Sequence, residues 1–421
     1  MMLAGRMVGG ACVIAAALAC GSDGGGDAWM GEVVDSGGVR VIVSRGAGLW
    51  GDEPPAIEEV LRFGSLSGGG PDEFGKVVAL DVDASGRIHV LDQQAREVRV
   101  FDAEGRHLRT LGGPGAGPGE LSASVLGVFV APDGTVGVPD IGNTRITRFG
   151  ADGAAIASIP IRLEHGVPIR WDATMDGALV AQLRHVPGAT MAPGEVGSTA
   201  RDPLVRIPIQ ALEGRSFTDT LASVPTGTSV TAGPDGVPRI GLFMPEPIWD
   251  LSESGTLVTA MNSEYRVDVH GSDGILSHVL VLAGERRAVT EAEKTRIRRL
   301  VGEMMADQGL PPAMVERITR ETTFADTYPA LAGVLARPNG EVWVQRVRTL
   351  DETASGEAAD FDPQDLGDRR WDVFEPGGRY MGVLTLPERF ALMKVVGDRV
   401  FGVLRDSLDV QHVVGVRVRT R

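Results

Sequence analysis

The sequence predicts an all-β fold, namely a six-bladed β-propeller built from four-stranded antiparallel blades. Three observations predict it: a segment that recurs along the chain, alternation of apolar and polar residues within each copy, and an abundance of turn-forming residues. The chain has 57 glycines and 25 prolines in 421 residues, and so many tight turns imply many short strands.

The recurring segment begins and ends on glycine. Its three clearest copies are GRIHVLDQQAREVRVFDAEG (Gly86–Gly105), GTVGVPDIGNTRITRFGADG (Gly134–Gly153) and GTLVTAMNSEYRVDVHGSDG (Gly255–Gly274). In each copy a short β-rich run follows the first glycine, and a second alternating run leads to the turn at the last glycine. Apolar runs before and after each copy bring the total to four antiparallel strands per unit of roughly 45 residues.

More degenerate units complete the ring. One opens near Gly177, another opens at Gly340, and the last turns at Gly397 and ends before a fourth strand can form. The N-terminal segments Val39–Ser44 and Glu58–Leu66 supply spare strands, which we expect to complete the last blade and close the ring. Closure explains the repetition, because a closed ring of copied sheets leaves no exposed edges. An array of β-sandwiches is the alternative, but it does not explain the spare strands.

Two insertions interrupt the β pattern. Thr290 and Glu293 have the spacing of a capping box, and the apolar residues from Ile297 to Met305 follow one helical face. With a second short helix in PPAMVERI, this predicts a helical insertion at about 289–320, between blades four and five, that packs on the propeller. The other insertion is an acidic loop at about 350–368.

The N-terminus has the pattern of a signal peptide. Residues 1–19 contain the apolar stretch MVGGACVIAAALA, too short to span a bilayer as a helix, and small residues precede Cys20. This resembles the lipobox of bacterial lipoproteins, in which the cysteine is lipidated; an ordinary secretory signal cut near Ala19 is the alternative. We expect residues 20–37 to be a flexible tether and 38–421 to form the propeller. No other cysteine remains after cleavage, so the mature chain can form no internal disulfide.

The first two blades carry a family resemblance. GGGPDEF (Gly68–Phe74) and GAGPGEL (Gly115–Leu121) recur at the start of a blade, and DIGNTRI (Asp140–Ile146) looks like a turn of NHL repeats. Together they resemble bacterial six-bladed β-propeller lipoproteins with NHL-like repeats, most of which have no assigned activity. The resemblance implies a cell-envelope location. Gly21 after the cysteine implies an outer-membrane lipoprotein that faces the periplasm.

The same resemblance leaves open whether the channel binds a metal ion. The related NHL group includes amidating lyases and other metal-dependent enzymes, and gluconolactonase-like propellers hold a metal ion in the central channel. We expect no cofactor, with a divalent cation such as calcium in the channel as the alternative.

Four acidic residues are candidate ligand positions at the mouth of the channel. Asp92 and Asp140 end the second strands of the first two blades, and Glu73 and Glu120 lie beside the starts of these blades. Two carboxylates on one rim could hold a polar ligand or a hard cation. The alternative, which we favour, is that all four accept hydrogen bonds from backbone N–H groups.

The net charge and the absence of certain motifs exclude several classes of function. The net charge of -15 argues against nucleic-acid binding. Trp-Asp pairs at Trp171, Trp249 and Trp371 resemble WD repeats only by chance, because the first two precede the opening turn. The acidic loop lacks the spacing of a calcium loop, and no Gly-x-Ser-x-Gly or HExxH motif occurs.

We therefore expect a non-catalytic binding or scaffold module, held to the membrane by a lipidated Cys20, whose ligand is an unknown protein or small molecule. A metal-dependent hydrolase or lyase that uses the central channel, lactonase-like or NHL-lyase-like, is the alternative.

Overall fold

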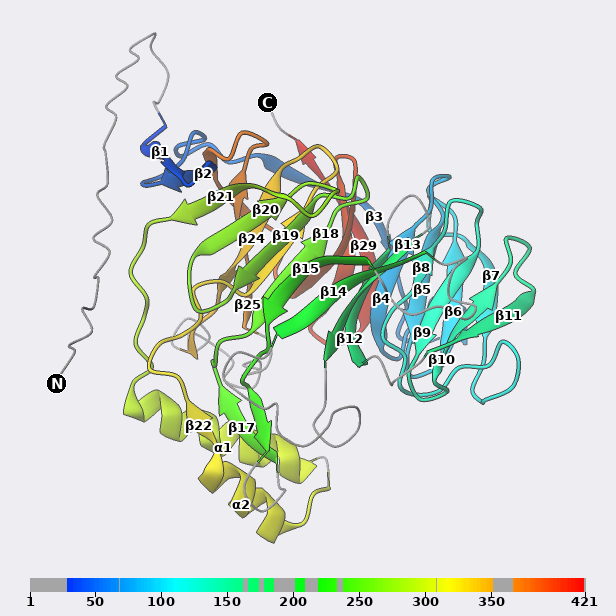
Figure 1. Cartoon of the computed structure of the whole chain (residues 1–421). Coiled ribbons are helices and arrows are strands. Elements are labelled where there is room, and N and C mark those ends of the chain that lie inside the picture. Colours follow the sequence, from blue (N-terminus) through cyan, green and yellow to red (C-terminus); the bar gives the residue numbers. More distant parts are fainter. Residues whose placement is uncertain are drawn as a thin grey trace, which may run out of the picture.

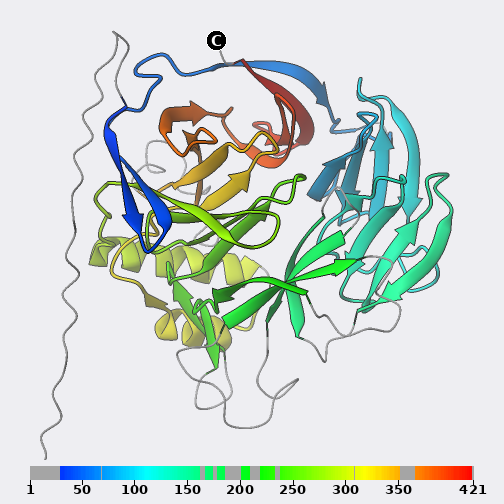
Figure 2. The same ribbon diagram turned by 45° about the horizontal axis from the view of Figure 1, so that its top comes forward.

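The repeated units form the six sheets of a closed ring, as the computed structural model of the chain shows (Figures 1 and 2). The structure describes residues 29–67, 69–161, 166–173, 178–184, 201–208, 219–232, 238–307, 309–350 and 366–419. The signal peptide, Cys20 and most of the acidic loop lie outside these ranges.

Each blade is a four-stranded antiparallel sheet. Blade one is β4 (Val77–Val82), β5 (Ile88–Asp92), β6 (Glu97–Phe101) and β7 (His107–Gly112). Blade two is β8 (Phe129–Val130), β9 (Val136–Asp140), β10 (Arg145–Phe149) and β11 (Ala155–Pro160). Blade three is β12 (Val167–Ala173), β13 (Ala178–Arg184), β14 (Arg201–Pro208) and β15 (Asp219–Pro225).

The second half of the ring repeats this order. Blade four is β18 (Pro247–Leu251), β19 (Leu257–Met261), β20 (Arg266–His270) and β21 (Leu276–Leu282). Blade five is β23 (Gly333–Ala336), β24 (Val342–Val347), β25 (Gly367–Phe374) and β26 (Tyr380–Thr385). Blade six is β27 (Phe390–Val396), β28 (Arg399–Arg405), β29 (Gln411–Arg419) and β3 (Ala56–Phe63). From blade six through blade one to blade five, the first strands of successive blades adjoin one another, so they form the wall of the central channel. The six-bladed prediction is confirmed.

The repeat depends on glycine for a conformational reason. The glycines that open and close the repeated segments have φ between 76° and 88°, a left-handed region that other residues enter only at a cost. They are Gly86, Gly105, Gly134, Gly153, Gly255, Gly274, Gly340 and Gly378. At Gly378 space is also limiting, because a Cβ would lie 2.9 Å from the Leu280 side chain and closer still to Ile42.

The N-terminal strands close the ring differently from the prediction. β3 pairs antiparallel with β29 and completes blade six, as predicted for Glu58–Leu66. The prediction for Val39–Ser44 is wrong. These residues form β2, which pairs in parallel with β21 and adds to blade four, and β1 (Gly31–Ser36) pairs with β2. β1 also lies within the segment predicted to be a flexible tether, so the ordered chain begins earlier than residue 38.

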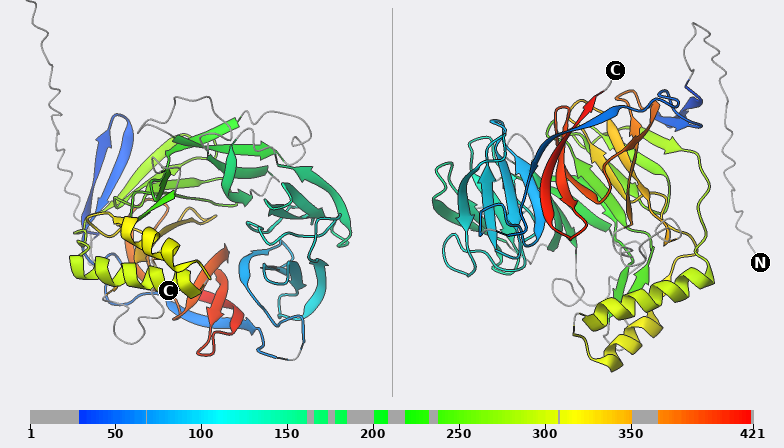
Figure 3. Two further views of the ribbon diagram at one scale, coloured as in Figure 1. Left: turned by 90° about the horizontal axis from the view of Figure 1, so that it is seen from below. Right: turned by 180° about the vertical axis from the view of Figure 1, so that it is seen from behind.

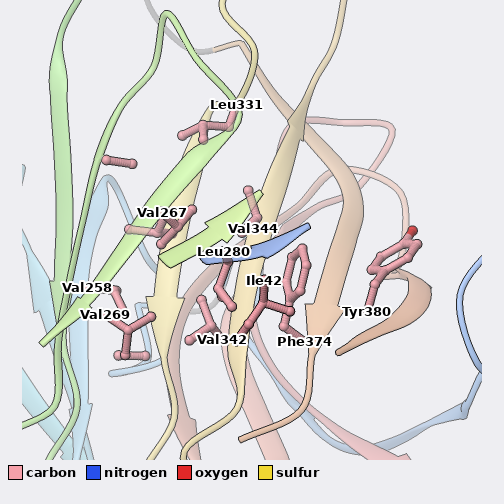
Figure 4. Packing of buried hydrophobic residues seen from close by; sticks show 13 residues of the cluster. Ile42, Val258, Val267, Val269, Leu280, Leu331, Val342, Val344, Phe374 and Tyr380 are labelled. Carbon is pink, nitrogen blue, oxygen red and sulfur yellow. The ribbon is translucent and has the colours of Figure 1, made fainter. Parts of the chain in front are cut away.

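The packing of Ile42 explains why β2 joins blade four. Its side chain is fully buried (0% exposed) in the apolar cluster between blades four and five, beside Leu280 and Phe374 (Figure 4). Beyond β2 the chain crosses the outer strand of blade five, where the N–H of Trp50 donates to the carbonyl of Met381 (2.7 Å). The N-terminal segment therefore contacts blades four, five and six in turn.

The helical insertion forms between blades four and five, as predicted. It consists of α1 (Glu291–Asp307) and α2 (Pro312–Glu321), which lie below the ring (Figures 1 and 3). The capping box is formed: the N–H of Thr290 donates to the Glu293 carboxylate (2.9 Å) and the N–H of Glu293 to the Thr290 hydroxyl (3.2 Å). A small sheet of β16 (Val230–Ala232), β17 (Pro238–Leu242) and β22 (Thr323–Phe324) accompanies the helices.

Candidate functional site

The central channel contains a cavity of about 630 Å³. Residues of the first strands of blades one, two, three, four and six line it, together with neighbouring turns. A volume of this size suits a small molecule, and a site built from five blades joins residues that lie far apart in the sequence. The cavity is therefore the first candidate site.

The wall of the cavity is acidic. Of the lining residues that the structure describes, six are acidic and three are basic, so negative charge is in excess. The acidic residues are Asp81, Asp83, Asp133, Asp172, Asp250 and Glu253, and the basic ones are Arg87, Arg170 and Lys394.

Three of these aspartates occupy equivalent positions. Asp81, Asp172 and Asp250 are each the penultimate residue of a blade's first strand. Each also lies five residues before the glycine that opens its repeat, at 86, 177 and 255. This spacing was a usable signal that the sequence reasoning missed. The Trp-Asp pairs dismissed as chance at Trp171 and Trp249 supply two of the three.

Backbone groups of the following blade hold two of these carboxylates in place. The N–H of Val130 donates to Asp81 (2.8 Å), and the N–H of Ala336 donates to Asp250 (2.8 Å). Each bond joins a blade to the next one around the ring. The carboxylates are thus fixed before any ligand arrives.

A lysine of the chain already occupies part of this acidic wall. The Nζ of Lys394 lies 2.9 Å from Asp81 and 3.4 Å from Glu253. Burial alone would lower the pKa of Lys394, but the charges of Asp81 and Asp172 raise it above its usual value. The ammonium group therefore stays charged, and it shows how a cation is bound here.

Asp250 titrates near neutral pH. Burial and the neighbouring Asp172 raise the pKa of Asp250 to about 7, although Arg170, the N–H of Ala336 and Lys394 oppose the shift. Arg170 lies 3.2 Å from Asp250 and packs its guanidinium over the Trp249 ring. The charge of the cavity therefore changes over the physiological pH range.

The donor set does not fit the channel metal ion that the family resemblance implies. Within the described ranges, no three His, Cys, Asp or Glu side chains are grouped so that they could hold a metal ion. A divalent ion needs several grouped oxygen ligands, whereas Asp81 and Asp250 each pair with one cationic side chain, Lys394 and Arg170, an arrangement that suits ammonium and guanidinium groups.

The predicted candidates Asp92 and Asp140 stabilise loops. The buried Asp92 (0% exposed) accepts N–H groups from Gly75 (2.8 Å), Lys76 (3.0 Å), Gln94 (3.0 Å) and Ala95 (3.2 Å). Asp140 does the same in blade two. Its donors are the N–H and hydroxyl of Ser122 and the N–H and side-chain amide of Asn143. Both carboxylates tie the start of a blade to its second strand.

Glu73 and Glu120 also accept backbone groups, each within its own loop. Glu73 accepts the N–H of Gly69 (3.0 Å), and Glu120 accepts the N–H of Gly117 (2.7 Å). None of the four candidates is among the residues that line the central cavity. The acidic residues that do line it include Asp81, Asp172 and Asp250.

Comparison with known proteins supports the propeller fold. The chain matches no protein-family model and no curated protein sequence. A protein from Bacteroides fragilis that is predicted to be exported superposes with a TM-score of 0.51 at 11% identity, covering 90% of this chain and all of its own. A DUF4221 family member from Bacteroides vulgatus gives 0.50 at 9% identity, covering 87% of this chain and all of its own.

These likenesses show the propeller fold alone. Propeller enzymes are less similar; a streptogramin B lyase superposes with a TM-score of 0.42 at 9% identity, covering 87% of this chain and 98% of its own. Neither of the described helices is long and apolar enough to span a bilayer.

Proposed function

We propose that the chain is an exported, lipid-anchored β-propeller of the bacterial envelope that binds a small organic cation in its central cavity without converting it. The observation that carries this proposal is the acidic wall of the cavity, with its carboxylates fixed by backbone groups of neighbouring blades.

The ion pairs of Lys394 with the acidic wall support an amine as the ligand. An ammonium group between two carboxylates is the arrangement that Asp81 and Glu253 make with the chain's own lysine. Asp172 and Asp250 line the same cavity, and Asp250 there pairs with the guanidinium of Arg170 (3.2 Å). A diamine of the putrescine type would place one charged end there.

The described lining residues also favour binding over chemistry. They include no histidine or cysteine, and the hydroxyl of Ser85 donates to Asp83 rather than to a base positioned for nucleophilic catalysis. The anchor rests on the sequence alone, because Cys20 lies outside the described residues; the likeness to a protein predicted to be exported is compatible with it.

Calorimetric titration of the purified mature protein with putrescine tests the ligand class. We expect saturable binding at pH 8 that Asp250→Asn weakens about tenfold, the loss of one charge-assisted contact. Binding should also weaken from pH 8 to pH 6, because a carboxylate with a pKa of about 7 becomes neutral as pH falls and no longer attracts a cation. Asp102→Asn, which changes an exposed turn, is the matched control and should bind like the wild type.

Two results would reject the proposal. One is the absence of putrescine binding at millimolar concentration. The other is turnover of a lactone or ester that depends on a stoichiometric metal ion, which would favour the hydrolase alternative.

A further inference from the structure

We propose that a second cavity, between blades four and five and next to the helical insertion, binds a small polyanion that carries carboxylate or phosphate groups. This cavity has a volume of about 960 Å³. Its walls come from the start of β20, the segment after β21, residues 328–330, and strands β24, β25 and β26. It shares no lining residue with the central cavity.

The lining of this second cavity is basic in an acidic protein. Among the described residues, five arginines line it against three acidic residues, whereas the whole chain has a net charge of -15. The arginines are Arg266, Arg286, Arg287, Arg346 and Arg370, and the acidic residues are Glu264, Glu285 and Asp372. A local excess of guanidinium groups attracts anions that the rest of the surface repels.

Four of the arginines are each held by a carboxylate. Their ion pairs are Arg266 with Asp268 (2.9 Å), Arg287 with Glu293 (2.9 Å), Arg346 with Asp372 (2.7 Å) and Arg370 with Asp368 (2.8 Å). Three of these carboxylates, those of Asp268, Glu293 and Asp368, do not line the cavity, yet all four arginine side chains stay between 35% and 46% exposed. Each guanidinium is therefore oriented by a carboxylate while more than a third of its side-chain surface stays exposed.

Arg346 has the most deeply buried carboxylate partner of the four. Asp372 is buried (1% exposed) and accepts hydrogen bonds from the hydroxyls of Tyr265 (2.8 Å) and Tyr380 (2.7 Å) as well as from Arg346. These bonds occupy both carboxylate oxygens and fix Arg346 where it borders the cavity. A cation held this way loses little side-chain entropy when an anion binds.

Tyr328 provides the same support on the side of the helices. Its hydroxyl donates to Glu293 (2.9 Å), and the guanidinium of Arg287 lies over its ring at 5.4 Å from the centroid. All three tyrosines of the chain line this cavity. Tyr265 and Tyr380 donate to Asp372 and Tyr328 donates to Glu293, so each tyrosine braces a carboxylate that holds one of the arginines.

A purely structural role accounts less well for this arrangement. Structural ion pairs need not converge on one space. Here guanidinium groups from four separate segments border one space that is large enough for a multiply charged molecule. The planar guanidinium fork matches carboxylate and phosphate oxygens in pairs, so both groups belong to the expected ligand class.

Titration of the purified mature protein with citrate and with inorganic pyrophosphate, at low ionic strength, tests this site. We expect saturable binding of at least one probe, which also tells carboxylate from phosphate preference. The double variant Arg266→Gln/Arg370→Gln should bind at least tenfold more weakly. A matched control is Arg106→Gln/Arg299→Gln, which removes two exposed arginines that are also ion-paired but lie outside the cavity. The control should bind like the wild type.

If the double variant does not fold, Arg286→Gln alone, in the segment after β21, should still weaken binding. Absence of binding for both probes, or equal binding by the wild type and the cavity variants, would overturn the proposal. Putrescine binding should be unchanged in the folded cavity variants, so failure here is separate from failure of the proposed function.

Discussion

Replacing Asp92 with alanine should destabilise the propeller more than any other change at the predicted ligand positions. The Asp92 carboxylate accepts four backbone N–H groups and is fully buried. A donor left without a partner costs roughly 1–3 kcal/mol when it is buried, and less when water replaces the carboxylate. Gly75, Lys76 and Gln94 are exposed residues, so water can reach their N–H groups in part. We expect a loss of about 3 kcal/mol in the free energy of unfolding.

Glu73→Gln is the matched comparison, because Glu73 accepts a single N–H group at an exposed position. The glutamine carbonyl can still accept it, so the expected loss is less than about 1 kcal/mol. Asp92→Asn should lie between the two, because it keeps one acceptor oxygen and loses the charge.

Urea unfolding followed by tryptophan fluorescence measures these differences. For a propeller of this size, 3 kcal/mol corresponds to about 4 °C in the melting temperature, so denaturant midpoints are the more sensitive measure. Equal losses for Asp92→Ala and Glu73→Gln, or a loss below about 1 kcal/mol for Asp92→Ala, would refute the assignment of Asp92 as the main loop-stabilising residue.

Two further predictions concern the N-terminal part of the chain. A protein that begins at residue 46 lacks β1 and β2 but keeps β3, so it should stay monomeric with lowered stability. One that begins at residue 65 exposes the edge of β29 and should aggregate, which size-exclusion chromatography detects. A monomer with an unchanged melting curve after loss of β3 would mean that the ring closes elsewhere. Cys20→Ser should leave the protein soluble or uncleaved on cell fractionation, and an unchanged membrane-bound product would contradict the lipobox interpretation.

The blades could be predicted because their determinants are local. The glycines at the turns, such as Gly86 and Gly105, are required by a positive φ, and the strand pattern repeats around them. The capping box of Thr290 and Glu293 likewise defines its helix within four residues. Such features depend on neighbours in sequence, so sequence reasoning finds them.

The pairing of β2 depends on distant residues. Its alternating pattern fits any open strand edge, and only the packing of Ile42 against Leu280 and Phe374 selects blade four. The acidic wall of the central cavity was missed for a related reason. An aspartate five residues before the opening glycine has a repeated position, but its direction into the channel follows only from closure of the ring.

The arginine-lined cavity had no local signature at all. The five arginines lie on four separate segments between residues 266 and 370. In the sequence each one has the pattern of an ordinary surface residue. Blade packing brings these segments together, and Glu293 of the helical insertion accepts the hydroxyl of Tyr328, which lines the cavity.

The position of β1 and β2 also determines the order in which the molecule would yield to mechanical tension. A pull on the chain ahead of β1 acts first on the β1–β2 hairpin and on the parallel ladder that joins Arg40–Ser44 to β21. β3, the strand that closes the ring, follows only after the segment that crosses blade five. It therefore experiences no force until the earlier contacts have broken. If the proposed lipid anchor holds the chain at its N-terminus, tension from the membrane would open this hairpin while the six blades remain a closed ring.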